Sequence, residues 1–312
     1  MSNGIIVKGP VKENAGSASL WSRIFIGNRG IRTGWRLTIF LVMLAGSIFG
    51  VFAMGILRIR AAAHIFGQGF LSPGLEYLAE IPTAICLLLC SLVMARIEKR
   101  SLGDYGLSLY RGAGKHFLWG LFWGLCVFFG VIVLIAAFHG FSFGGLALHG
   151  LALWKYASLW AIGFLLVGFV EEFLYRGYVQ LTLAQAIGFW PSAIVWSLVF
   201  AAMHLANPNE NLAGAFEVLV FAIFACLTLR RTGALWFAIG FHAAGDYAET
   251  FLFSVPDSGY AASGTLLNSS FHGPAWLTGG KVGPEASVIS IVVLCVATFC
   301  FHFLFPQAPG RE

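Results

Sequence analysis

The chain has 312 residues, of which 58% are hydrophobic, 15% aromatic and only 11% charged, whereas about a quarter of the residues in a soluble domain carry charge. This composition excludes an ordinary soluble domain and indicates an all-α, polytopic bundle of membrane helices. The net charge of +5 comes from basic residues spread over separate short segments. We therefore expect contact with anionic lipids and no nucleic-acid partner.

A basic amino-terminal segment precedes the apolar part of the chain. Residues 1–33 carry several Lys and Arg against the single acid Glu13, and they lack the apolar core and cleavage site of a secretory signal. They are predicted to form a cytoplasmic tail, followed by one membrane domain over residues 34–306. The apolar stretches of that domain, six clear ones and two weaker ones (191–206 and 215–229), are each close to the roughly 20 residues that cross a membrane. The clear ones cover 37–57, 77–95, 117–138, 156 onward, 234–253 and 286–305.

About eight helices that begin in the cytoplasm return the carboxyl terminus to the same side. With this orientation most of the 19 Lys and Arg residues fall on the cytoplasmic side, as the positive-inside rule requires. We therefore predict an integral membrane protein with both termini cytoplasmic. The two longest polar connections, 96–116 and 255–285, are predicted to be loops that shape access to a site.

Ionisable side chains interrupt three of the apolar stretches. Each costs a few kcal/mol at mid-bilayer on insertion scales, so each is a functional candidate and needs a partner. They are Glu171, Glu172 and Arg176 in the fourth stretch, His204 in the fifth, and His242 with Asp246 in the seventh.

Helical spacing separates the two adjacent glutamates. Glu172 and Arg176 are four positions apart and share a helix face, which indicates an ion pair. Glu171 points about 100° away from Glu172, so the pair leaves Glu171 unexplained. Glu171 is therefore the leading candidate for chemistry.

The two histidines have neighbours one helical turn away. Phe200 precedes His204, and Asp246 follows His242, where its carboxylate can fix the orientation of the imidazole. If the fourth helix continues to about residue 183, its rise of about 1.5 Å per residue places Glu171 and His204 roughly 20 Å above the cytoplasmic turn. His242 and Asp246 come out at roughly 16 and 22 Å, so all four groups share one level of the membrane.

Three short motifs now indicate a family. "EEFLYR" matches E-E-x-x-x-R, "FAAMH" matches F-x-x-x-H, and "HAAGD" matches H-x-x-x-[N/D], in this order on successive membrane segments. The chain resembles the CPBP intramembrane proteases, which include type II CAAX prenyl endopeptidases and bacteriocin-processing or immunity proteins. The resemblance covers about residues 156–255, and "VPDSG" at 255–259 resembles the bacterial branch, which implies a bacterial inner membrane.

The resemblance also implies roles for the motif residues. It makes Glu171 the catalytic glutamate and His204 and His242 the catalytic histidines, with Glu172 and Arg176 in support. Asp246 stands at a position where some members carry Asn, and an ionised Asp accepts hydrogen bonds but cannot donate one to an oxyanion. We expect Asp246 to orient His242, to bind a metal or to be protonated.

Two mechanisms remain open from the sequence. In the first, Glu171 is the general base, Glu171 and His204 activate a water, and His242 stabilises the oxyanion. In the second, a metalloprotease uses Zn²⁺ held by His204 and His242 with Glu171 or Asp246. Both predict cleavage of a membrane-associated protein or peptide.

Two other classes of function compete with a protease. The first is a non-catalytic immunity factor or scaffold, in which the polar cluster locks helices together. The second is a proton-coupled transporter, because Glu76, Glu80, Glu217 and Glu249 add acids near or within the apolar stretches. We expect these four glutamates to be structural, because three of them lie near predicted helix ends, and we leave them out of the candidate site.

Overall fold

The computed structural model describes residues 26–27, 30–54, 70–109 and 112–306. Most of the predicted amino-terminal tail and part of the first apolar stretch lie outside these residues. The long helices are α2 (Thr33–Met54), α4 (Pro73–Glu98), α5 (Ala113–Ala137), α6 (Gly150–Glu172), α7 (Val179–Ile187), α8 (Phe189–His204), α9 (Leu212–Thr232), α10 (Trp236–Asp246) and α12 (Val288–Leu304). Two π-helical segments, η2 (Phe173–Tyr178) and η3 (Tyr247–Leu252), continue α6 and α10.

Each of the eight predicted apolar stretches is mostly helical over the residues that the structure describes, so the prediction of an all-α bundle is confirmed. In the described part of the chain, five helices are long and apolar enough to cross a membrane: α2, α4, α5, the α6–η2–α7 helix, which is kinked at Gly177, and α9. The fourth predicted helix continues past Arg176 to Ile187, as the depth argument requires. Gly188, with φ of 90°, then ends it and begins the turn into α8.

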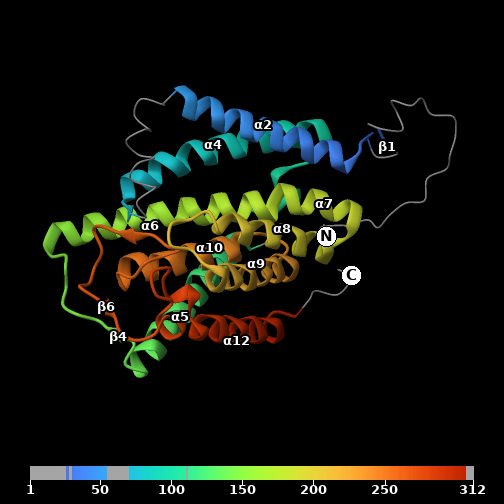
Figure 1. Cartoon of the computed structure of the whole chain (residues 1–312). Coiled ribbons are helices and arrows are strands. Elements are labelled where there is room, and N and C mark those ends of the chain that lie inside the picture. Colours follow the sequence, from blue (N-terminus) through green and yellow to red (C-terminus); the bar gives the residue numbers. More distant parts are fainter. Residues whose placement is uncertain (1–25, 28–29, 55–69, 110–111, 307–312) are drawn as a thin grey trace.

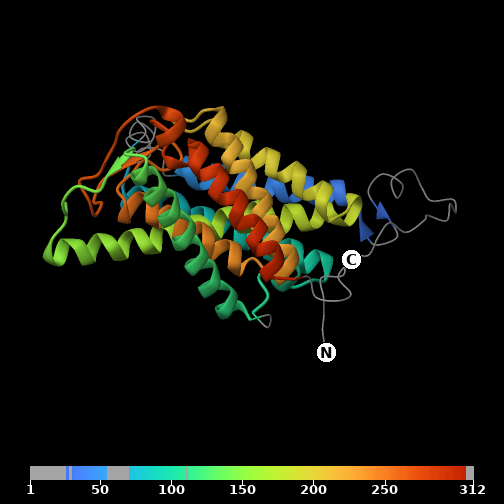
Figure 2. The ribbon, with the colours of Figure 1, turned by 90° about the horizontal axis from the view of Figure 1, so that it is seen from below.

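The helices form a bundle in which α2 and α4 pair on one side of α6–α7, and α5 and α12 lie on the other (Figure 1). Seen from below, α12 runs beside α5 and α9 (Figure 2). Large apolar side chains such as Phe49, Phe129 and Phe299 point outward and are more than half exposed. This outward apolar surface is what a bundle surrounded by lipid requires.

Small residues let α10 approach its neighbours closely. A side chain at Gly240 would collide with the main-chain carbonyl of Phe117 on α5. A Cβ atom at Gly168 on α6 would lie 3.0 Å from the Ile239 carbonyl oxygen and 3.1 Å from the Ala243 nitrogen. Helix pairs in membranes depend on such small residues because the packing of main chain against main chain replaces a hydrophobic driving force. The α10 helix is thereby held at the centre of the bundle.

The connection 255–285 is more ordered than the predicted loop. Its strand β5 (Ala261–Ala262) pairs in parallel with β3 (Phe70–Leu71), and β6 (Ser270–Phe271) pairs antiparallel with β4 (Phe141–Ser142). A short helix, α11 (Ala275–Thr278), and a 3₁₀ turn, η4 (Pro284–Ala286), follow. The remaining elements are the pair β1 (Ile26–Gly27) and β2 (Gly30–Ile31) and the 3₁₀ turn η1 (Leu102–Tyr105). The connection therefore covers one end of the bundle as a folded cap.

Candidate active site

The two adjacent glutamates lie at the last two positions of α6, immediately before η2. Their exposures differ sharply, because 29% of the Glu171 side chain is accessible and none of the Glu172 side chain is. Glu172 Oε1 accepts a hydrogen bond from Arg176 Nη1 at 3.1 Å, and the Arg176 side chain is only 1% exposed. Helical spacing therefore predicted this pair correctly, and it leaves Glu171 facing open space.

Arg176 is held by aromatic rings as well as by its carboxylate. Its guanidinium carbon lies 4.1 Å from the ring centre of Phe200 on α8 and 5.6 Å from that of Phe221 on α9. A guanidinium at this distance from a ring face is attracted by the ring quadrupole. The pair thus joins α6–η2 to α8 and α9 behind the accessible glutamate.

His242, on α10, is surrounded by carboxylates. Its Nδ1 lies 2.9 Å from Glu172 Oε1, and its Nε2 lies 3.6 Å from Glu171 Oε2 and 3.6 Å from Asp246 Oδ2. The same oxygen, Glu172 Oε1, accepts from Arg176 Nη1, so it is an acceptor here too and Nδ1 of His242 donates to it. The orientation of the ring is therefore fixed across the close contact of α6 with α10.

This contact corrects one expectation. Orienting His242 was one of three roles expected of Asp246, yet the hydrogen bond of the ring is the one that Nδ1 donates to Glu172, and Asp246 approaches only Nε2. The physical reason is that Gly168 allows α6 to lie against α10, which brings Glu172 within reach of Nδ1. Glu172 therefore has two partners, Arg176 and His242.

His204, the last residue of α8, has a defined tautomer. Its Nδ1 lies 2.9 Å from the Phe200 carbonyl oxygen, which can only accept, so Nδ1 carries the proton and Nε2 of the neutral ring is an acceptor. The Phe200 ring also packs edge-on against the imidazole, with ring centres 4.4 Å apart. Phe200 therefore fixes His204 through both its backbone and its side chain.

Side chains from four helices and the cap line one cavity of about 220 Å³. The cavity brings together Glu171, His204, His242 and Asp246, whereas Glu172 and Arg176 lie outside its lining. Its wall also contains acids that the sequence analysis left out. They are Glu76 and Glu80 from α4 and Asp257 from the cap.

The sequence contains different indications that these three acids, Glu76, Glu80 and Asp257, belong to the site. Glu76 and Glu80 lie four positions apart and so share a face of α4, a spacing that the sequence displays. Asp257 lies in "VPDSG", which served only to indicate a branch of the family. Asp257 is 7% exposed, and this burial raises the pKa of its carboxyl above the ordinary value because the ionised form loses hydration.

The residues suggested for zinc do not fit one ion in this conformation. A single ion requires its ligand atoms to lie within about twice the metal–ligand distance of one another, which is roughly 4–5 Å for zinc. Among the described residues, His204 and His242 do not meet such spacing together with Glu171 or Asp246. The arrangement of these side chains therefore does not form a zinc site.

The comparisons with known proteins agree with the three motifs. Residues 152–248 match the family model described as type II CAAX prenyl endopeptidase Rce1-like. This range contains all the residues of the three motifs, from Glu171 to Asp246. Among curated proteins, no sequence matches the chain significantly. With its motif residues on three packed helices and this match across them, the segment 152–248 is similar to the Rce1-like (CPBP) family of type II CAAX prenyl endopeptidases.

Proposed function

We propose that the protein hydrolyses a peptide bond in a membrane-associated protein or peptide, with Glu171, His204 and His242 as its catalytic residues. The observation that carries the proposal is the contrast between two adjacent carboxylates. Glu172 is fully enclosed and paired, whereas Glu171 opens into the cavity that both histidines line. A carboxylate that faces a cavity without a cationic Lys or Arg partner is suited to act as a general base.

The water that attacks the substrate is held between two acceptors. The carboxylate of Glu171 accepts one hydrogen of the water, and Nε2 of His204 accepts the other, because its Nδ1 is the protonated nitrogen. One lone pair of the water oxygen then remains free to attack a carbonyl carbon. His204 acts as a positioning group and an acceptor, without a change in its own protonation.

The donor to the oxyanion is Nε2 of His242. Because Nδ1 donates to Glu172, Nε2 can donate only when the ring is the doubly protonated imidazolium. The carboxylates of Glu171 and Asp246, each 3.6 Å from Nε2, favour that cation electrostatically. The Asp at position 246 therefore supports the donor, although it cannot itself donate to the oxyanion.

The steps balance in protons and electrons. Glu171 takes a proton from the water, the water oxygen bonds to the carbonyl carbon, and the C=O π electrons move to the oxygen that His242 stabilises. When this intermediate collapses, the C–N bond breaks and the amine leaves with the proton that Glu171 had taken. Glu171 returns to the carboxylate, and the products are an acid and an amine.

The test compares purified full-length variants on a farnesylated peptide that ends in a CAAX sequence, and on the membrane proteome of cells that express each variant. Glu171→Gln keeps the shape of the side chain but removes the base, so cleavage is expected to fall at least about 100-fold. Glu210→Gln is the matched control, because it makes the same substitution at a glutamate that does not line the cavity. The Glu210→Gln variant is expected to cleave the peptide normally.

The results of these assays distinguish the proposed protease from a metal-assisted protease and from a non-catalytic protein. Full cleavage by Glu171→Gln would refute the proposed base. If the wild type cleaves nothing in either assay and Glu171→Gln folds normally, the result would favour the non-catalytic alternative. Loss of cleavage after chelator treatment, with recovery on addition of Zn²⁺ alone, would favour the metal-assisted alternative.

A further inference from the structure

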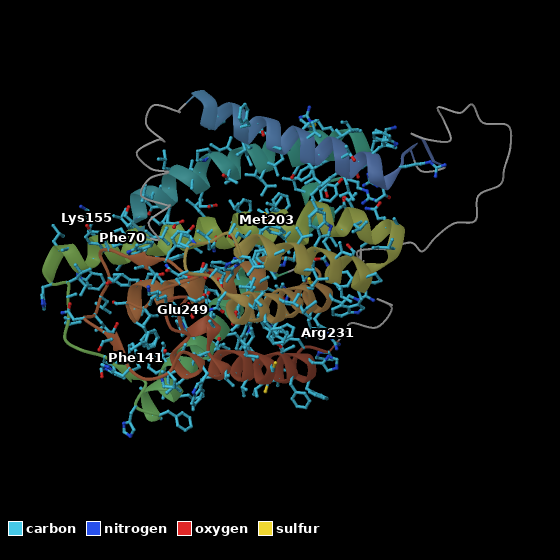
Figure 3. All side chains as sticks on the ribbon, viewed as in Figure 1. Phe70, Phe141, Lys155, Met203, Arg231 and Glu249 are labelled. Atoms are coloured by element: carbon cyan, nitrogen blue, oxygen red, sulfur yellow. The ribbon has the colours of Figure 1, made fainter. Side chains whose placement is uncertain are left out.

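Three buried carboxylates meet where the cap joins the bundle. Glu249 comes from η3, Asp257 from the connection after it, and Glu285 from η4 just before α12. One ligand oxygen from each residue lies within 4.8 Å of the others. Their exposures are 1%, 7% and 8%, and Glu249 lies inside the bundle between the ends marked by Lys155 and Arg231 (Figure 3).

The hydrogen bonds of this carboxylate cluster leave Glu249 without a donor. Asp257 Oδ2 accepts from the Thr250 hydroxyl at 2.9 Å. Glu285 accepts from Ser258 twice, from its backbone nitrogen at 2.7 Å and from its hydroxyl at 3.2 Å. Glu249 Oε1 is enclosed and has no hydrogen-bond partner among the described residues. An enclosed carboxylate oxygen without a donor is costly, and it indicates that a ligand of positive charge completes the site.

No basic side chain supplies that charge in the part of the chain that the structure describes. Arg36, Arg100 and Arg176 pair with Glu98 or Glu172, and no described Lys or Arg makes an ion pair with the carboxylate cluster. Burial also deprives the carboxylates of Asp257 and Glu285 of most of their contact with water. Three such groups in contact require either bound protons or a bound cation.

We propose that Glu249, Asp257 and Glu285 bind a hard divalent cation, with calcium preferred over magnesium. All the ligand atoms are oxygens, and no His or Cys belongs to the cluster, which disfavours zinc. Oxygens bound to one Ca²⁺ at about 2.3–2.6 Å lie up to roughly 5 Å apart, and three carboxylates can supply up to six of the six to eight ligands that calcium takes. Magnesium needs shorter bonds and near-octahedral geometry.

The cation would hold the cap against the bundle beside the active site. Asp257 and its neighbour Ser258 line the cavity of Glu171, and the Ser258 carbonyl accepts from the Asn207 side chain at 3.2 Å. Asn207 lies three residues after His204. Occupancy of the cluster therefore fixes one wall of the cavity, and the binding site itself does not depend on the proposed hydrolysis.

Calcium binding to the full-length protein in detergent, after chelator treatment, tests the proposal by calorimetric titration and by the thermal midpoint. We expect one Ca²⁺ per chain, an affinity at least tenfold above that for Mg²⁺, and a midpoint that rises by several degrees with added Ca²⁺. Glu249→Gln and Glu285→Gln should each abolish the binding and the shift. Without calcium, Glu249→Gln should be more stable than the wild type, because it removes one of three crowded charges and still folds.

Matched controls separate this site from others. Glu217→Gln alters a buried carboxylate that accepts from Ser290 at 3.0 Å outside the cluster, and Glu171→Gln alters the active-site cavity. Both should retain calcium binding. No calcium-dependent shift in the wild type, an equal shift in Glu249→Gln and Glu285→Gln, or tighter binding of Zn²⁺ than of Ca²⁺ would each overturn the proposal.

Discussion

Replacement of the whole Glu172–Arg176 pair is expected to separate stability from activity. Both side chains are enclosed, with exposures of 0% and 1%. The single change Glu172→Leu leaves the Arg176 charge buried without its carboxylate, and breaking a buried pair in this way costs about 3–5 kcal/mol of the free energy of unfolding. Replacing both members by apolar residues avoids the lone charge and is often neutral.

The double variant Glu172→Leu/Arg176→Leu still loses the contact of the guanidinium with Phe200 at 4.1 Å, which is worth about 1 kcal/mol. Its free energy of unfolding should therefore lie within about 1–2 kcal/mol of the wild type. Its cleavage rate should still fall, by about 10- to 100-fold, because Nδ1 of His242 loses the acceptor that orients the ring.

The assay measures unfolding in detergent and the cleavage rate per folded molecule for the wild type, the single variant and the double variant. Recovery of stability in the double variant without recovery of cleavage is the expected result. A double variant that cleaves at the wild-type rate would refute the orienting role of Glu172 toward His242. A double variant as unstable as Glu172→Leu would refute the argument from the buried charge.

Three further predictions concern the packing around the site. Gly168→Val should separate α6 from α10, since a Cβ there already lies 3.0 Å from a carbonyl oxygen. We expect about 1–3 kcal/mol of destabilisation together with loss of cleavage, and a fully active Gly168→Val protein would contradict the close approach. Glu98→Gln removes the negative charge that pairs with the buried Arg36 and turns one of the two oxygens that accept from Arg36 and two tyrosine hydroxyls into an amide donor. It should cost about 2–4 kcal/mol while the cleavage rate per folded molecule stays unchanged. A large fall in that rate would count against a purely structural role. Phe200→Leu should lower the free energy of unfolding by about 1 kcal/mol. It should reduce cleavage less than His204→Ala does, because the backbone carbonyl of residue 200 still fixes the tautomer of His204. Equal losses of cleavage in the two variants would show that the Phe200 ring matters more than its carbonyl.

Local periodicity explains how much of the site could be predicted from the sequence. The Glu172–Arg176 pair depends only on a separation of four residues in a helix, so the spacing was sufficient. The shared depth of Glu171 and His204 depends only on the helical rise and on where the chain turns, and Gly188 marks that turn. These predictions needed no knowledge of how the helices cross.

Contacts between helices could not be predicted in the same way. The hydrogen bond from His242 to Glu172 depends on the distance between α6 and α10, which Gly168 sets only once the two helices are packed. Glu76 and Glu80 reach the cavity because α4 packs against α6. Their spacing on one face was visible in the sequence, but nothing local indicated which neighbour that face would meet.

The π-helical segment between Phe173 and Tyr178 has a consequence for the phase of the helix that contains it. A π turn takes up one residue more than an α turn, so it can absorb an inserted residue without rotating the helix beyond it. Within this segment Gly177 has a ψ of −107°, outside the helical range, so the helix bends there and a helical wheel drawn from Glu172 does not keep its phase into α7. Glu171 before this bend faces the cavity, and the hydroxyl of Tyr178 after it donates to Glu98 at 2.6 Å. A residue inserted inside α6 would rotate one of these two groups out of place.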